Sequence, residues 1–286
     1  MFEFKQDLDI ILKTLNITSA DICRELGFDM PTVSNWLNGK FEPDRRSKED
    51  IYSYAYAKGL NINSAYENPL SDLMNKQKCE LLYHGSKQGI TGEIDINKSS
   101  EYNDFGKGFY LGETLEQSST FVSLYDESIV YSYGLFSNKL KTYTFDNDND
   151  WIITIAYNQH QLQKYKDSKK LKKIIDKTKD VDVIIAPIAD NRMMEIIREF
   201  AEGNITDKAC CYALNAMNLG KQYVLKTDKA INALGFVKEY YECHQEKIDY
   251  ETLRRKRQNE RYEAIKDFRN KYRNKGKYID QIIWEL

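Results

Sequence analysis

The sequence of 286 residues predicts an α+β protein, and three observations lead to this fold class. Residues 1–60 place their apolar side chains at the spacing of amphipathic helices. From Cys79 onward, short runs rich in β-branched and aromatic residues mix with helical stretches without a regular alternation. From about Ile248 the chain is again helical and highly charged. These changes predict four segments: a helical domain at 1–60, a linker at 61–78, a mixed domain at 79–243 and a helical extension at 244–286.

The N-terminal segment contains a helix, a turn with glycine and a second helix. Thr18 or Ser19 can cap the first of these helices, which we expect to stop at Gly27. Pro31 begins the second helix and Gly39 ends it, because proline suits the first helical turn and glycine the position after the last.

Residues 21–39 therefore resemble the helix-turn-helix of phage repressors. In that arrangement Val33, Trp36 and Leu37 would face the core. Short polar side chains would face outward, where they can meet base edges or phosphates: Thr32, Ser34, Asn35 and Asn38. The segment holds more acids than bases, so strong binding to operator DNA would need a dimer. The alternative is a helical bundle used for protein contacts, since a fold does not fix a function.

The mixed domain reads as seven strands and five helices. The predicted strands are Glu80–Tyr83, Gly108–Leu111, Ile129–Phe136, Lys141–Phe145, Val181–Ile185, Gln222–Lys226 and Phe236–Tyr241. The predicted helices are Leu115–Leu124, Trp151–Tyr165, Met193–Glu202, Asp207–Met217 and Asp228–Leu234. The basic run at 254–257 in the helical extension is either a solvated helix face or a surface for an acidic substrate.

The composition limits the class of protein. Apolar residues make up 41% of the chain, which is enough for a core, and a net charge of −2 gives no overall attraction to nucleic acid. No apolar run reaches the length of about 20 residues that a membrane helix needs. Five cysteines and three histidines without a recurrent spacing argue against a disulfide framework and a zinc site. We expect a reduced, cytoplasmic protein without a metal.

Three stretches of the mixed domain carry the functional signal. They are Leu81-Leu82-Tyr83-His84-Gly85-Ser86, Asp104-Phe105-Gly106-Lys107-Gly108-Phe109-Tyr110-Leu111 and Gln222-Tyr223-Val224-Leu225. In this order they resemble the NAD-binding core of the ADP-ribosyltransferases, in the branch of diphtheria toxin and the poly(ADP-ribose) polymerases. The signature of that branch is His–Tyr–Glu, and here Gln222 stands at the third position. The chain also resembles a bacterial ADP-ribosyltransferase-like family with glutamine there, whose members are expected toxins of defence or toxin–antitoxin systems.

The resemblance implies a split β-sheet core with flanking helices and roles for the first motif. His84 would hydrogen-bond a ribose hydroxyl of NAD, which is the co-substrate. Gly85 would let the backbone approach the nicotinamide carboxamide, because no Cβ intrudes. Ser86 would add a polar contact. A histidine that serves only the structure is the alternative.

The resemblance also assigns aromatic side chains. Phe109 and Tyr110 would belong to the NAD site, with the Tyr110 ring stacked on nicotinamide. Phe121, eleven residues after Tyr110, would complete a sandwich around that ring. A cationic nicotinamide favours an electron-rich aromatic face. The alternative is that these rings are core residues, as phenylalanine and tyrosine usually are.

The third motif determines whether the resemblance extends from NAD binding to catalysis. Gln222 can orient the ribose through a hydrogen bond but carries no negative charge for the cationic transition state. Asp190 is the candidate for a compensating carboxylate, and it is equally well placed to cap the helix that follows.

We therefore expect a mono-ADP-ribosyltransferase that acts on a macromolecule, either protein, RNA or DNA. Operator DNA bound through residues 21–39 and an antitoxin are further expected partners. A catalytically silent NAD or ADP-ribose sensor that regulates transcription is one alternative, and a transcription factor without NAD binding is another.

Overall fold

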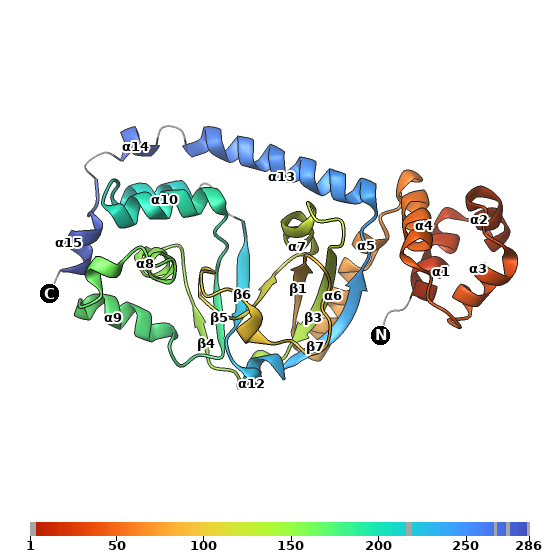
Figure 1. Cartoon of the computed structure of the whole chain (residues 1–286), viewed down its shortest axis with the longest axis horizontal. Helices are drawn as coiled ribbons and strands as arrows, with labels where there is room; N and C mark the ends of the chain where they lie inside the picture. The colour runs from red at the N-terminus through yellow and green to blue at the C-terminus, as the bar shows by residue number, and fades with distance from the viewer. Residues whose placement is uncertain (1–3, 216–218, 266–267, 273–274, 285–286) are drawn as a thin grey trace. The chain divides into compact units, whose positions relative to one another are not determined.

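A computed structural model describes residues 4–215, 219–265, 268–272 and 275–284 of the chain (Figure 1). The chain forms two compact units, each assembled from three separate segments. Unit 1 contains residues 1–90, 114–135 and 235–254. Unit 2 contains residues 91–113, 136–234 and 255–286. The predicted α+β class is confirmed, because helices and strands mix in both units without a regular alternation.

Unit 1 begins with six helices. These are α1 (Phe4–Leu15), α2 (Ser19–Leu26), α3 (Met30–Leu37), α4 (Arg45–Ala57), α5 (Ile62–Ala65) and α6 (Glu67–Gln77). The predicted caps hold: Thr18 and Asp21 form a reciprocal capping box, and Gly27 ends α2 in the left-handed conformation. The segment 61–78, expected as a linker, is occupied by α5 and α6.

The strands of unit 1 are β1 (Glu80–Ser86), β3 (Ile129–Leu135) and β7 (Leu234–Tyr240), in the order β1-β3-β7, and β7 enters the unit at Gly235. The pair β1–β3 is antiparallel. Helix α7 (Leu115–Val122) packs on β1. One hydrophobic core joins the strands to the N-terminal helices, because Leu8, Ile11, Tyr83, Val130 and Tyr240 belong to the same buried cluster. The helices before residue 60 therefore share their core with the sheet.

Unit 2 holds the other four strands, β2 (Phe109–Gly112), β4 (Thr142–Thr144), β5 (Val183–Pro187) and β6 (Lys221–Leu225), in the order β4-β5-β6-β2. Strands β4 and β5 are parallel, and the pairs β5–β6 and β6–β2 are antiparallel. The core of the unit gathers buried side chains from the strands and helices, including Trp151, Ile184, Phe200 and Val224.

The helices of unit 2 are α8 (Asn149–Asn158), α9 (Lys169–Ile175), α10 (Asn191–Glu202), α11 (Asp207–Asn215), α12 (Asp228–Ile231), α14 (Phe268–Lys271) and α15 (Ile279–Ile283). Four single 3₁₀ turns also lie in this unit, at Ile96–Lys98, Ser137–Lys139, Gln163–Tyr165 and Asp176–Thr178. The charged helix predicted near the C-terminus is α13 (His244–Ile265), which begins in unit 1 and passes into unit 2 after Arg254.

The predicted strands and helices of the mixed domain are all present, with shifted ends. The helix predicted at 151–165 ends at Asn158, and the chain turns at His160 with a positive φ of 57°. The final predicted residues of the helix at 207–217 lie outside the described residues. Helix α9 was not predicted, because its lysine-rich sequence shows only a narrow apolar stripe of Leu171 and Ile174.

Candidate functional site

The predicted site residues divide between the two units. Unit 1 holds His84, Gly85, Ser86 and Phe121. Unit 2 holds Phe109, Tyr110, Asp190 and Gln222.

His84-Gly85-Ser86 lies within strand β1, which continues to Ser86, whereas the sequence predicted a strand that ends before His84. The three residues face Tyr131, Val130 and Ile129 of β3 in antiparallel register. The His84 side chain is half-buried. The Ser86 hydroxyl donates a hydrogen bond to the Gly89 carbonyl at 2.8 Å, so it also closes the turn after the strand.

Gly85 is required by the packing of α7. A Cβ at this position would lie 2.7 Å from the Ser118 carbonyl oxygen and 2.9 Å from Cγ1 of Val122. Both contacts are shorter than a real Cβ tolerates, and one of the atoms is backbone. The glycine thus serves the close approach of helix to strand, which is a different reason from the one that the sequence suggested.

Phe121 is one of three large apolar side chains that α7 and the turn after it leave exposed. The exposed fraction is 65% for Phe121, 54% for Leu124 and 39% for Tyr125. Lys87 lies over the Tyr125 ring, with Nζ 4.7 Å from its centre. Phe121 is therefore not a core residue, and its ring is open to a ligand.

In unit 2, Tyr110 and Gln222 lie on adjacent strands. Tyr110 pairs with Val224, and Gly112 pairs with Gln222, in the antiparallel β2–β6 ladder. Residues that face each other in such a ladder share one side of the sheet, so the Tyr110 and Gln222 side chains are diagonal neighbours on one face. Phe109, the residue before Tyr110, is buried with 8% of its surface exposed.

The Tyr110 hydroxyl closes the loop that precedes its strand. It donates a hydrogen bond to the Gly106 carbonyl at 2.7 Å and accepts one from the Phe105 amide at 3.1 Å. Burial and the nearby Asp104 carboxyl raise the pKa of Tyr110 above its ordinary value, so the hydroxyl stays neutral. The ring packs against the core of the unit while remaining partly exposed.

Gln222 is buried, with 7% of its surface exposed, and its amide group is fixed by two acceptors. Nε2 donates to Oδ2 of Asp104 at 2.9 Å and to the Pro187 carbonyl at 3.1 Å. Both partners are acceptors, so the chemistry sets the orientation of the amide: a flipped amide would place oxygen against oxygen. With both amide hydrogens engaged, Oε1 is the group of this side chain that remains to accept a hydrogen bond.

Asp104 opens the second motif, but the sequence assigned it no role in the site. It lies in the turn directly before Phe105, and Nδ2 of Asn158 donates to its backbone carbonyl at 2.9 Å. Burial raises the pKa of the Asp104 carboxyl to about 6, although hydrogen bonds from Gln222 and the Ala189 amide oppose the shift. The signal in the sequence was its place in the motif, directly before Phe-Gly-Lys-Gly.

The loop between Asp104 and Tyr110 is held from several sides. Nζ of Lys226 donates to the carbonyls of Phe105 and Lys107, and burial lowers the pKa of Lys226 to about 8. A Cβ on Gly108 would lie 2.7 Å from Cγ1 of Val224, so β6 also requires a glycine in this motif. The loop is thus preorganised by contacts within unit 2.

A family model described as a protein of unknown function, DUF3990, matches residues 81–236. The chain belongs to this family. The region that defines DUF3990 in this chain includes all three motifs and Asp104, whereas helices α1 to α6 lie before it. No curated protein and no solved structure matches the chain.

Asp190 caps α10. Its Oδ1 accepts hydrogen bonds from the amides of Arg192 at 3.0 Å and Met193 at 2.9 Å. The sequence left two roles open for Asp190, a compensating carboxylate or a helix cap, and the structure shows the cap. The carboxylate that accepts a hydrogen bond from Gln222 is that of Asp104.

The candidate DNA-contacting residues lie on helix α3. Val33 and Trp36 are buried and Leu37 is partly buried, as predicted. Ser34 and Asn38 are exposed, and the other two candidates, Thr32 and Asn35, are half-buried. Nδ2 of Asn38 donates to the Ser34 carbonyl at 2.8 Å, which ends the helix.

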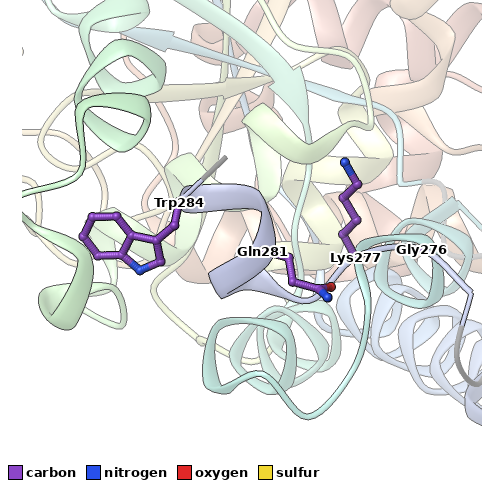
Figure 2. Close-up of a pocket in the computed structure, with 4 residues that line it drawn as sticks. All are labelled: Gly276, Lys277, Gln281 and Trp284. Carbon is purple, nitrogen blue, oxygen red and sulfur yellow. The ribbon is translucent and has the colours of Figure 1, made fainter. Parts of the chain in front are cut away.

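The described residues also form a surface hollow, which lies apart from the predicted site residues in the sequence. A surface hollow of about 440 Å³ in unit 2 is lined by Gly276, Lys277, Gln281 and Trp284, none of which belongs to the three motifs (Figure 2). Among the described residues, no group of three or more His, Cys, Asp or Glu side chains is arranged to hold a metal ion. No helix in the described parts of the chain is long and apolar enough to span a membrane.

Proposed function

We propose that this protein is an NAD-dependent mono-ADP-ribosyltransferase that modifies a macromolecule. The observation that carries the proposal is the pair of diagonal neighbours on β2 and β6, Tyr110 and Gln222, with the Asp104 carboxylate 2.9 Å from the Gln222 amide. An aromatic ring, an oriented hydrogen-bond acceptor and an anion are the groups that cleavage of a cationic N-glycoside requires. The split-sheet core of the ADP-ribosyltransferases is part of the same proposal.

The residues present fit NAD as the co-substrate. Tyr110 offers a partly exposed ring, and Oε1 of Gln222 is available to accept a hydrogen bond from a ribose hydroxyl. The resemblance also assigns His84 to a ribose hydroxyl and Phe121 to the nicotinamide ring; both belong to unit 1, where His84 is half-buried and Phe121 is exposed. Bound NAD would supply the labile glycosidic bond, and the protein supplies orientation and charge.

The proposed reaction balances without a further reactant. The bond between the ribose anomeric carbon and the nicotinamide nitrogen breaks, and its electron pair leaves with nicotinamide, which becomes neutral. A nucleophilic oxygen or nitrogen of the acceptor forms a bond to that carbon and loses its proton to solvent. The products are ADP-ribosylated acceptor, nicotinamide and a proton. Single transfer fits better than chain elongation, because Gln222 has no charge to activate a hydroxyl of a growing polymer.

We further propose a role as a bacterial toxin or defence effector, with α3 contacting operator DNA and an antitoxin as a partner. The capping box of α2, the glycine at its end and the exposed Ser34 and Asn38 support the helix-turn-helix part of this proposal. An electrophoretic mobility assay on the DNA upstream of the coding region tests it. Loss of the shift in Ser34→Ala with Asn38→Ala would support the operator contact.

The first test of the activity is release of nicotinamide from NAD, with and without cell lysate. His84→Ala should abolish it, and His244→Ala is the matched control because His244 is exposed at the start of α13. Release that requires lysate indicates transfer to an acceptor. Release without lysate indicates hydrolysis or self-modification.

A silent NAD sensor is the second candidate, and one observation favours it: the third motif presents an uncharged Gln222. In that case calorimetry would detect NAD binding while the release assay stays at background. Absence of both NAD binding and release would reject both candidates.

A further inference from the structure

The identities of residues 104 and 222 depend on each other. The Gln222 amide faces two acceptors, which are the Asp104 carboxylate and the Pro187 carbonyl. A glutamate at 222 would direct a carboxylate oxygen at both of them and would place two like charges about 3 Å apart. Glutamine at 222 and aspartate at 104 are therefore a matched pair, and the pair as a whole keeps one negative charge.

Asp104 has features that a purely structural carboxylate lacks. Its partners in unit 2 are the Gln222 amide and backbone amides, and none of the described groups that shift its pKa is a cation. Its position is fixed by the loop that Asn158, Lys226 and Tyr110 hold. A preorganised anion without a cation is the environment that stabilises a developing positive charge.

We infer that Asp104 supplies the negative charge of the site and acts through Gln222, which is a positioning residue. This inference rests on the proposed function. The hydrogen bond from Nε2 to the Asp104 carboxylate polarises the Gln222 amide, and Oε1 gains electron density. When NAD is bound, that oxygen would accept a hydrogen bond from the ribose, as the glutamate carboxylate does in the family that the sequence resembles. As the glycosidic bond breaks and its electron pair leaves with nicotinamide, the polarised oxygen and the anion behind it stabilise the cationic carbon.

The test moves the single negative charge of the pair from residue 104 to residue 222. Asp104→Asn removes the anion while keeping an acceptor for Nε2, and we expect nicotinamide release to fall at least about 100-fold with a change in KM for NAD below about threefold. Gln222→Glu creates two adjacent carboxylates and should also reduce the rate. The double variant Asp104→Asn with Gln222→Glu restores one charge, and its rate should return to within about tenfold of the wild type.

Asp95→Asn is the matched control. Asp95 is exposed in the same unit, and its Oδ1 caps a 3₁₀ turn by accepting from the Asn97 amide at 2.9 Å. Its substitution should leave the release rate within about twofold. Thermal unfolding without NAD gives a second readout, because removal of an uncompensated charge should leave Asp104→Asn at least as stable as the wild type.

The outcomes separate this inference from the proposed function. If the wild type releases no nicotinamide in any lysate, the proposed function fails, and the inference fails with it. If the wild type is active and Asp104→Asn keeps its rate, the inference alone is overturned. Loss of activity in Asp104→Asn together with lower thermal stability and no recovery in the double variant would make Asp104 structural and would also overturn it.

Discussion

Two aspartates, one in each unit, are held in opposite ways. In unit 1, Asp7 of α1 is 3% exposed and faces Nζ of Lys238 at 2.9 and 3.1 Å. The hydroxyls of Tyr52 and Tyr66 also donate to its two carboxylate oxygens. In unit 2, Asp104 accepts hydrogen bonds from the Gln222 amide and from backbone amides, and no cation in the described part of the chain shifts its pKa.

The difference separates a carboxylate that stabilises a fold from one that a site can use. Asp7 joins α1 to β7, and its charge is matched by that of Lys238, which lies over the Tyr66 ring at 4.1 Å. Burial lowers the pKa of Lys238, and Asp7 opposes this shift. Asp104 has no such match, so burial raises its pKa to about 6. An unmatched charge costs stability, and that cost is typical of functional positions.

The largest effect is expected for Asp7→Ala. The substitution leaves Lys238 buried and unpaired, and it also removes the acceptor for Tyr52 and Tyr66. We expect the free energy of unfolding to fall by about 3–5 kcal/mol, measured by urea denaturation. Asp9→Ala on the same helix is the control, because the Asp9–Lys13 pair is exposed and should contribute less than about 0.5 kcal/mol. A loss below about 1 kcal/mol for Asp7→Ala would remove the contrast between the two aspartates.

The next effect is expected for Gln222→Glu, which places a second carboxylate beside Asp104. The protein should lose roughly 2 kcal/mol of stability at pH 8 and recover most of it near pH 5, where the two carboxyls can share a proton. The readout is the unfolding midpoint in urea at both pH values.

Gln245→Glu is the control for that substitution. Nε2 of Gln245 donates to Oδ1 of Asp249 at 3.0 Å on an exposed face of α13, so the new like-charge pair there should cost at most about 0.5 kcal/mol. If Gln222→Glu and Gln245→Glu lost the same free energy of unfolding, burial of Asp104 would not affect the cost of a neighbouring carboxylate.

Asp104→Asn should stabilise the protein at pH 7 by about 1–2 kcal/mol. The folded pKa lies above the ordinary value of 3.8, so the charged carboxyl costs stability as the pH rises from about 4 through 6. The facing groups, Gln222, the Ala189 amide and the neutral Tyr110 hydroxyl, do not titrate in this window. Thermal unfolding of both proteins at pH 4 and pH 7.5 should show a difference only at the higher pH. If Asp104→Asn were instead less stable than the wild type at pH 7.5, the negative charge of Asp104 would be balanced by its surroundings.

The smallest effect is expected for Tyr66→Phe. It removes one hydroxyl donor from Asp7 but keeps the ring beneath Lys238, so the loss should be about 1 kcal/mol in urea denaturation. Tyr56→Phe is the matched variant, because its hydroxyl donates to the exposed Asp249 at 2.7 Å and should matter less. A loss for Tyr66→Phe as large as that for Asp7→Ala would point to the tyrosine rather than the ion pair as the main support.

Much of the local structure could be predicted from the sequence. Thr18 and Gly27 mark the ends of α2 because capping depends on residues within one or two turns. The strands of the mixed domain follow from runs of β-branched and aromatic side chains. The sequence did not predict helix α6, because residues 67–77 are mostly polar and only Leu70 and Met74 are buried. For the candidate site, the motifs contain Tyr110, Gln222 and Asp104, but the sequence did not predict that the Asp104 carboxylate bonds the Gln222 amide.

By itself, the sequence determined most of the elements, the three motifs and the caps of α2, since each depends on neighbours in the chain. Only the tertiary structure decided which buried charges are matched. Asp7 and Lys238 are 231 residues apart, and Asp104 and Gln222 are 118 residues apart. No periodicity links such residues, because the pairing arises when strands and helices from different segments pack together. The same packing made the glycines of the motifs necessary, through α7 at Gly85 and β6 at Gly108.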